Sequence, residues 1–216
     1  VYGNFTAGGL SNTSGIIFIS GDCEMVGAAN IINDTGPITI WGNCRRVVNM
    51  TNSGAGTITV VGDMELGGNI TNVGTMAFGS LNCKGAVNNT GAVSITVNGD
   101  CTINGLFTNT TGGVMIYGNA TLGSSISTTT GNLTIYGNLT TVGSLTSTDT
   151  GDFTIGGNCK IGTTVSIGNA ASILTIKGNL ETAGDVTSAG TITIGSLVCK
   201  GNLDNTGAVA LTINGD

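Results

Sequence analysis

The sequence contains no histidine, and charged residues make up only 8% of its 216 positions. Histidine is the commonest metal ligand and the usual acid–base group near neutral pH, so its absence argues against a metal site and against an enzyme. Six Lys and Arg residues are scattered against twelve acidic ones, which gives a net charge of −6 without a basic cluster. We therefore expect no cofactor, no metal and no nucleic-acid partner.

Long apolar runs are also absent, so the sequence predicts no transmembrane span. Glycine occurs 38 times but not at every third position, which excludes a collagen helix. The low charge and the abundant Ile, Val and Leu are not those of a disordered chain. Because the sequence shows no initiator Met and no signal peptide, we interpret it as a processed product or an excerpt of a longer protein.

A short tract returns along the whole chain and reads apolar–Thr–apolar–x–Gly–Asn/Asp–apolar–x, as in Ile38–Arg45 and Leu133–Thr140. The glycine, or the residue taken as its equivalent, recurs every 18 to 21 residues, at positions 3, 21, 42, 62, 81, 99, 118, 137, 157, 178, 197 and 215. A fixed period of this length is typical of solenoids, and the two-residue alternation inside the tract indicates strands. We predict an all-β fold, a single-stranded parallel β-helix of about eleven rungs that runs through residues 1–216.

Asn and Asp follow the glycine, which we number as position zero of each rung. Coiling the chain once per rung stacks equivalent residues about 4.8 Å apart, so side chains at +1 can bond to one another as a ladder and stabilise a turn. The alternative is a row of calcium sites. The predicted Asn/Asp ladder consists of Asn4, Asp22, Asn43, Asp63, Asn82, Asp100, Asn119, Asn138, Asn158 and Asn179.

Charged residues recur at position +3, and their signs alternate wherever neighbouring rungs are both charged. Stacked opposite charges contribute little stability, but they favour one register, because a slip of one rung would place like charges together. Arg46, at +4, has no explanation in this pattern. The predicted charge ladder consists of Glu24, Arg45, Glu65, Lys84, Lys160, Glu181 and Lys200.

All six cysteines fall at position +2, which also accepts plain hydrophobic residues and is expected to face inward. They can serve as small core residues, or neighbours can be cross-linked, because the rung spacing lies within the Cα separation of a disulfide. The pattern permits Cys23–Cys44 and Cys83–Cys101, and leaves Cys159 and Cys199, two rungs apart, unpaired. A zinc site is not expected, since a straight stack cannot surround a metal tetrahedrally.

A second level of repetition has a period of about 116 residues. The segment Gly79–Asp100 matches Gly195–Asp216 at fifteen of twenty-two positions. We interpret the chain as one continuous rod made of two duplicated modules, residues 1–100 and 116–216, with six rungs each and no linker.

The phrases Gly137–Thr140, Asp204–Gly207 and Leu211–Asp216 resemble the β-helical repeats of filamentous-haemagglutinin-type secreted adhesins. The resemblance implies a right-handed parallel β-helix exported to the cell surface, although helices of that family rarely contain cysteine. The Gly–Asn/Asp–x–Thr tract is also similar to that of bactofilins, which are cytosolic, more highly charged, and polymerise end to end.

Ten Asn-x-Ser/Thr sequons are present, which either reflect the high Asn and Thr content or mark glycosylation of an exported protein. The candidate glycosylation sites are Asn4, Asn12, Asn33, Asn49, Asn69, Asn88, Asn109, Asn119, Asn132 and Asn138.

No polar or helical cap is recognisable at either end, and solenoids normally need one. We therefore expect a structural protein, the subunit of an extracellular filament that forms by end-to-end stacking, with itself as partner and about 53 Å of rise per chain. The alternative is the shaft of a larger secreted adhesin that contacts cell-surface or matrix glycans. A polysaccharide-acting enzyme is a distant third interpretation, because the outward acids Asp63 and Glu65 are already explained as ladder members.

Overall fold

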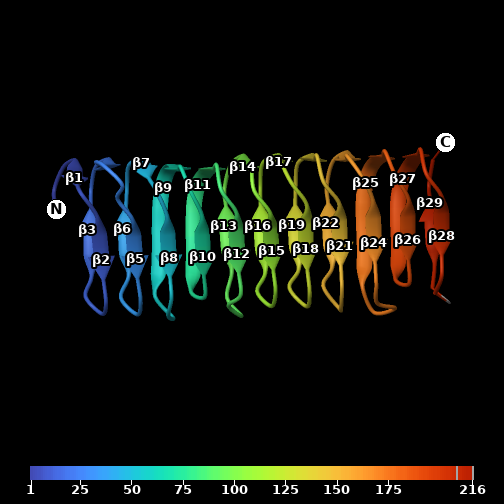
Figure 1. Ribbon diagram of the computed structural model, residues 1–216, viewed down its shortest axis with the longest axis horizontal. Coiled ribbons are helices and arrows are strands. Elements are labelled where there is room, and N and C mark those ends of the chain that lie inside the picture. The colour runs from blue at the N-terminus through green and yellow to red at the C-terminus, as the bar shows by residue number, and fades with distance from the viewer. Residues whose placement is uncertain (208, 216) are drawn as a thin grey trace.

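The computed structural model describes residues 1–207 and 209–215, and it shows a straight rod of stacked rungs with the termini at opposite ends (Figure 1). All regular elements are parallel β-strands, and one sheet supplies a strand from each of eleven rungs. The predicted all-β solenoid is therefore confirmed. Asp216, the last residue of the duplicated segment, lies outside the described residues. The described part of the chain forms no helix, so it offers no long apolar helix with which to cross a membrane.

The eleven-stranded sheet forms one wall of the rod, and each of its strands has three residues. The outer two residues of a strand point into the core and the central one points to solvent, which is the two-residue periodicity of a strand. Adjacent strands pair without register shifts, so Ile70 lies between Met50 and Val87. The strands are β2 (Leu10–Asn12), β5 (Ile31–Asn33), β8 (Met50–Asn52), β10 (Ile70–Asn72), β12 (Val87–Asn89), β15 (Phe107–Asn109), β18 (Ile126–Thr128), β21 (Leu145–Ser147), β24 (Val165–Ile167), β26 (Val186–Ser188) and β28 (Leu203–Asn205).

The second sheet carries the apolar–Thr–apolar tract and bends at the glycine of each rung. Strands before the bend are β3 (Ile17–Ile19), β6 (Ile38–Ile40), β13 (Ile95–Val97), β16 (Val114–Ile116), β19 (Leu133–Ile135), β22 (Phe153–Ile155) and β29 (Leu211–Ile213). Strands after it are β1 (Phe5–Ala7), β4 (Cys23–Met25), β7 (Cys44–Val47), β14 (Cys101–Ile103), β17 (Ala120–Leu122), β20 (Leu139–Thr141) and β23 (Cys159–Ile161). Four longer strands run through the bend: β9 (Thr57–Leu66), β11 (Thr75–Cys83), β25 (Ile173–Thr182) and β27 (Thr191–Cys199).

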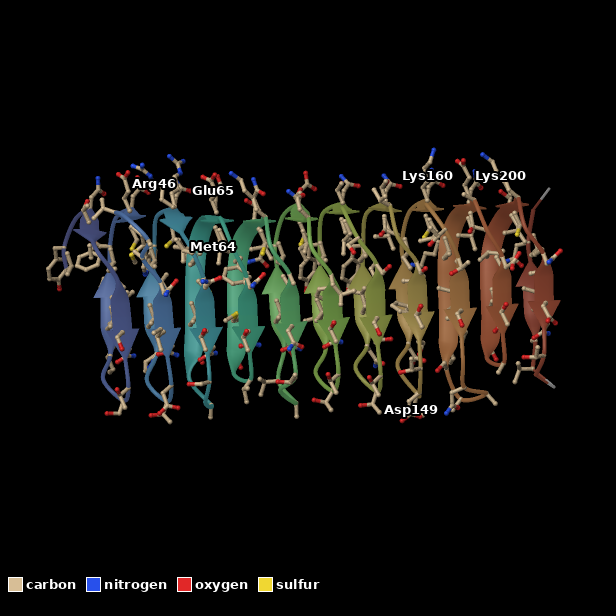
Figure 2. The ribbon with its side chains drawn as sticks, in the orientation of Figure 1. Arg46, Met64, Glu65, Asp149, Lys160 and Lys200 are labelled. Atoms are coloured by element: carbon tan, nitrogen blue, oxygen red, sulfur yellow. The ribbon has the colours of Figure 1, made fainter. Side chains whose placement is uncertain are left out.

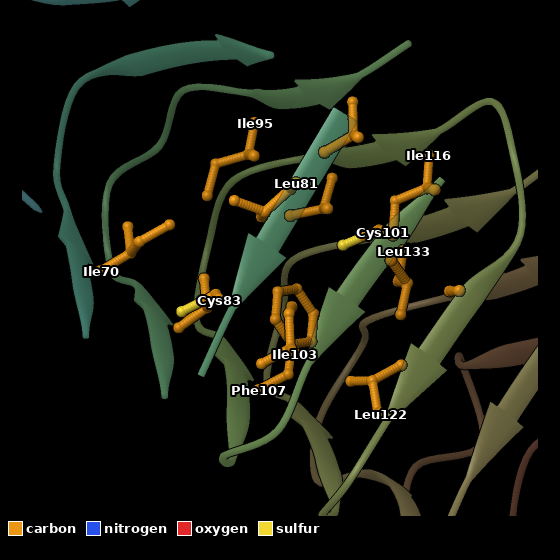
Figure 3. Packing of buried hydrophobic residues seen from close by; sticks show 14 of the residues in the cluster. Ile70, Leu81, Cys83, Ile95, Cys101, Ile103, Phe107, Ile116, Leu122 and Leu133 are labelled. Atoms are coloured by element: carbon orange, nitrogen blue, oxygen red, sulfur yellow. The ribbon is translucent and has the colours of Figure 1, made fainter. Parts of the chain in front are cut away.

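The core is a continuous column of inward Ile, Leu, Val, Met, Phe and Cys side chains that runs from Leu10 to Ile194 (Figure 3). Phe78 and Phe153 are its largest fully buried members. Each fully buried aliphatic or aromatic side chain contributes roughly 1.5–3 kcal/mol to folding. Because every rung is covered only by its neighbours, this contribution depends on stacking, as in other solenoids.

The predicted register is wrong for two rungs. The sequence predicts the bend at Leu81 and Leu197, but both residues lie two positions after the bend, paired with Met64 and Leu180. The bends are at Gly79 and Gly195, each 17 residues after the preceding one. A side chain at Gly79 would place its Cβ 2.3 Å from the carbonyl oxygen of Val61, so only glycine fits there. Serine follows these two glycines, whereas the other rungs have Asn or Asp at this position. The Gly–Asn/Asp motif is therefore missing here, and the sequence places the bend two residues too late.

The irregular rungs recur at the offset of the sequence duplication. The ten-residue strands β9 and β25 are 116 residues apart, and so are the nine-residue strands β11 and β27. Both strand pairs also contain a register shift at the bend.

Candidate functional site

An outer polar ladder lies at position +1, on the solvent side of each bend. The Asp22 Oδ1 atom accepts the backbone N–H of Asn43 at 2.8 Å, and Asn43 Oδ1 accepts the N–H of Asp63 at 2.8 Å. The same bond recurs with Asn4, Asp100, Asn119, Asn138 and Asn158 as acceptors. The side chain needs only an acceptor oxygen for this bond, which explains why Asp and Asn exchange freely in the column.

The composition and bonding of this ladder differ from the prediction at two points. Asn82 is not a member, because it pairs with Glu65; Ser80 takes the place and donates its hydroxyl to Asp63 Oδ1 at 2.7 Å. Bonds between side-chain amides are also the exception, as from Asn138 Nδ2 to Asn119 Oδ1 at 3.1 Å. Within the described residues, no three His, Cys, Asp or Glu side chains gather in a way that could hold a metal ion.

A second, inner ladder was missed by the sequence analysis. In the N-terminal half, the third residue of each strand in the eleven-stranded sheet is an Asn that faces the core, 0% exposed from Asn33 onward. Each amide donates to the next, as from Asn52 Nδ2 to Asn72 Oδ1 at 3.2 Å and from Asn72 Nδ2 to Asn89 Oδ1 at 2.8 Å. The ladder consists of Asn12, Asn33, Asn52, Asn72, Asn89 and Asn109. Its signal in the sequence is an Asn two residues after an apolar residue, repeated once per rung.

The inner column changes its chemistry in the C-terminal half, where it continues as Thr128, Ser147, Ile167, Ser188 and Asn205. No hydroxyl of this column bonds to the equivalent residue of the next rung in the described part of the chain. Ser147 donates to Gly151 O at 2.8 Å and lies 3.2 Å from Ser172 Oγ, and Ser188 donates to Gly190 O at 2.7 Å. The Thr128 Oγ1 atom is buried and has no partner in the described part of the chain.

The predicted charge ladder is only partly formed. Figure 2 shows Arg46, Glu65, Lys160 and Lys200 along one edge of the rod. Glu24 pairs with Arg46 at 2.9 Å, although Arg45 is its register neighbour. Arg46 has a φ of 62° and forms a β-bulge, which turns its side chain back toward the preceding rung.

The charges at rungs with the corrected register do not stack as expected. Lys84 and Lys200 follow the ends of β11 and β27, two positions beyond the predicted column, so the expected Glu65–Lys84 and Glu181–Lys200 neighbours do not form. Glu181 instead pairs with Lys160 on the preceding rung, at 3.6 Å.

The six cysteines are free thiols and occupy two columns rather than one. Cys23 and Cys44 are register neighbours as predicted, but they are not cross-linked. The Cys44 thiol donates to the Cys23 sulfur, which lowers the pKa of Cys23 and raises that of Cys44. The proposed Cys83–Cys101 pair is wrong in register, because Cys83 lies beside Ile103. Cys199 is shifted from its predicted column in the same way as Cys83.

Three of the ten predicted sequons are inaccessible in the folded chain. Asn12, Asn33 and Asn109 belong to the inner ladder, where their amide nitrogens donate hydrogen bonds, so a glycan on them is incompatible with this fold. The remaining asparagines, exposed except for the half-buried Asn49, are Asn4, Asn49, Asn69, Asn88, Asn119, Asn132 and Asn138.

Two polar grooves of about 390 Å³ lie over the strands that follow the bend. The first groove is lined by Asn4, Phe5, Thr6, Asp22, Cys23, Glu24, Asn43, Arg45, Arg46 and Glu65. The second is lined by Asn138, Leu139, Thr140, Asn158, Cys159, Lys160, Asn179 and Glu181. Both grooves are lined mainly by positions +1 to +3 of successive rungs. They are related by the sequence duplication, because Asp22 and Glu65 of the first groove lie 116 residues before Asn138 and Glu181 of the second. The duplication thus carries the groove as well as the fold.

A comparison with known protein families, characterised proteins and solved structures finds no match to this chain.

Proposed function

We propose that this protein is a structural rod, the subunit of an extracellular filament in which successive copies stack end to end. The observation that carries the proposal is that every rung offers the same strand edges along the axis of the rod, so that one rung can stack on another. Along the sides, each strand of an inner rung is paired on both edges, as β10 is with β8 and β12. At the ends, β2 and β28 each have one neighbour among the described strands.

The last rung exposes residues that are buried elsewhere in the same columns. Leu203 is 44% exposed, whereas Val186, its neighbour on the preceding rung, is 1% exposed. Ile213 is 42% exposed, against 1% for Ile194. A further rung stacked here would bury these side chains and pair the strand edges, whether it comes from the same chain or from a second copy, which offers the required strand spacing.

The ladders support the same proposal. They fix each rung against its neighbour by hydrogen bonds that run along the rod axis. Such bonds make a rod resist bending and sliding, which suits a load-bearing element. The extracellular location is a proposal too: it rests on the likeness to secreted adhesins and on the seven sequons that are not buried.

The test compares two double variants by sedimentation and electron microscopy over a range of concentrations. Leu203→Lys with Ile213→Lys places charges on the end face, and should abolish concentration-dependent assembly. Val61→Lys with Val142→Lys, 52% and 66% exposed on the sides, is the matched control and should assemble like the unmodified chain. If the unmodified chain stays a single short rod at every concentration, the filament proposal fails and the adhesin-shaft interpretation replaces it.

A further inference from the structure

The chain places its tyrosines and its tryptophan at one position of the rung, directly before a Gly–Asn pair. These four residues are Tyr2, Trp41, Tyr117 and Tyr136, with exposed fractions of 96%, 59%, 48% and 55%. Phenylalanine, by contrast, mostly fills the core, as at Phe78, Phe107 and Phe153. The amphipathic aromatics are therefore kept at the surface, where they add little to folding and offer flat apolar faces to a ligand.

The exposed aromatics form two pairs, and one ring of each pair lies two residues before a residue that lines a groove. Phe18 and Trp41 meet edge to face with ring centroids 6.4 Å apart. Tyr117 and Tyr136 stack at 4.8 Å with an interplanar angle of 5°. Trp41 lies two residues before Asn43 of the first groove, and Tyr136 lies two residues before Asn138 of the second.

The first groove offers both hydrogen-bond donors and acceptors. Asp22 uses Oδ1 for the ladder, while its second oxygen has no partner among the described residues. The side-chain amide nitrogens of Asn4 and Asn43 and the guanidinium of Arg45 are likewise unpaired within the described part of the chain. A hydroxyl group both donates and accepts, so a ligand rich in hydroxyls can satisfy this mixture.

The charges of the grooves exclude a polyanion as the preferred ligand. Three carboxylates (Asp22, Glu24 and Glu65) and two guanidinium groups line the first groove. One lysine and one glutamate, Lys160 and Glu181, line the second, and they pair with each other. Neither groove presents a net positive charge, and the whole chain has a net charge of −6.

We propose that the two grooves with their aromatic neighbours are binding sites for a neutral polysaccharide. The C–H face of a sugar ring packs on Trp41 or Tyr136, and the hydroxyls around its edge bond to the amide and carboxylate groups of the adjacent groove. Equivalent groove residues lie six rungs apart and Trp41 and Tyr136 five rungs apart, about 24 to 29 Å along the rod, so one polymer chain can occupy both sites and gain avidity. This activity does not depend on filament formation.

The sole tryptophan makes the first site directly observable. Titration with cellotetraose, which is too short to fill both grooves, should shift and quench the fluorescence of Trp41, and calorimetry should give two sites per chain. Tyr136→Ala should leave the Trp41 response intact and reduce the stoichiometry to one. Trp41→Ala with Tyr136→Ala should weaken binding by roughly a hundredfold, whereas Val61→Ala with Val142→Ala, the matched control, should have no effect.

Three results would overturn the proposal. One is the absence of both fluorescence and calorimetric responses to cellotetraose, laminaritetraose and mannotetraose. Another is an unchanged affinity in the variant that lacks both Trp41 and Tyr136. The third is tighter binding of oligogalacturonate than of the neutral sugars, because this would contradict the charge argument. None of these results depends on whether the chain forms filaments.

Discussion

The two halves of the rod build the same core but fill its inner polar column differently. From Asn12 to Asn109 the column is an unbroken chain of amides that bond from rung to rung. From Thr128 to Ser188 it holds hydroxyls and one isoleucine, and the serine hydroxyls bond to the adjacent loops instead. The strands keep an unshifted register in both halves of the eleven-stranded sheet.

This comparison separates what specifies the fold from what stiffens it. The coil forms in both halves, so the apolar columns and the bend glycines suffice to define it. An amide can donate to one neighbour and accept from the other across the rung spacing of about 4.8 Å, whereas the serine hydroxyls of the inner column bond to loop residues and not to one another. The Asn ladder therefore couples neighbouring rungs inside the core. The half without it lacks this inner coupling, although its outer ladder still links rungs through Asn119, Asn138 and Asn158.

The largest difference between the halves should appear when a member of the inner column is truncated. Asn72→Ala removes two buried side-chain bonds and leaves Asn89 Oδ1 without a donor, which should lower the free energy of unfolding by about 3 kcal/mol. Ser188→Ala removes only local bonds to Gly190 and should cost about 1 kcal/mol. Urea unfolding measures both, and equal losses would contradict the rung-coupling role of the amides.

The buried thiols should respond to pH alike in both halves, because burial is the largest cause of the raised pKa at both Cys101 and Cys159. Burial raises the pKa of Cys101, with smaller contributions from Cys83 and Asp100, and burial raises that of Cys159; both reach about 12. The unfolded thiols ionise near 9.0, so the stability that each contributes is complete below pH 9 and is lost as the pH rises toward 12.

We expect a loss of about 1.4 kcal/mol per thiol and pH unit within this window. The free energy of unfolding of the unmodified chain should fall between pH 8 and pH 10. Cys101→Val and Cys159→Val should each make this fall smaller by the same amount, as measured by urea unfolding. If only one of the two substitutions changed the pH dependence of the free energy of unfolding, the two halves would bury their cores to different extents.

The boundary between the halves offers a stabilising substitution. Thr128 is the first residue of the column without an amide, and its buried hydroxyl lacks a partner among the described residues. Thr128→Val keeps the shape and removes the desolvated hydroxyl, so the free energy of unfolding should rise by about 1 kcal/mol. Ser147→Ala, whose hydroxyl is bonded, is the contrasting variant and should be destabilising. A loss of stability in Thr128→Val would mean that its hydroxyl has a partner.

The smallest effect is expected from the two exposed ion pairs, one in each half. The side chains of Arg46 and Glu24 are 69% and 51% exposed, and those of Lys160 and Glu181 are 63% and 44% exposed. Double-mutant cycles with Glu24→Gln and Arg46→Gln, and with Lys160→Gln and Glu181→Gln, should give couplings of about 0.5 kcal/mol or less that vanish in high salt. A coupling several times larger would assign these pairs a structural role that their exposure does not suggest.

The fold could be predicted from the sequence because a solenoid repeats its rules at every rung. Alternation around the outward Thr and a glycine at the bend recur often enough to fix the period and the inward face. The predicted register was wrong where Ser80 and Ser196 replace the Asn or Asp that marks the bend. The motif then matched two positions later at Asn82, and the duplicated rung was aligned with it at Val198.

The inner ladder and the sequons show what local sequence could not decide. Asn33 and Asn109 read as glycosylation sites because the sequon says nothing about burial, and burial depends on which face of the coil the residue occupies. The bulge at Arg46 was equally hidden, since it reflects the extra residue that β7 carries relative to its neighbours. The grooves and the aromatic pairs are formed by residues of different rungs, so they could be recognised only in the three-dimensional structure.

Electron microscopy of the purified chain at rising concentration tests the central claim most directly. If copies of the chain stack end to end, we expect long unbranched filaments with an axial repeat near 53 Å, the rise of eleven rungs at about 4.8 Å each. Single rods of that length at all concentrations, without end-to-end contacts, would contradict it.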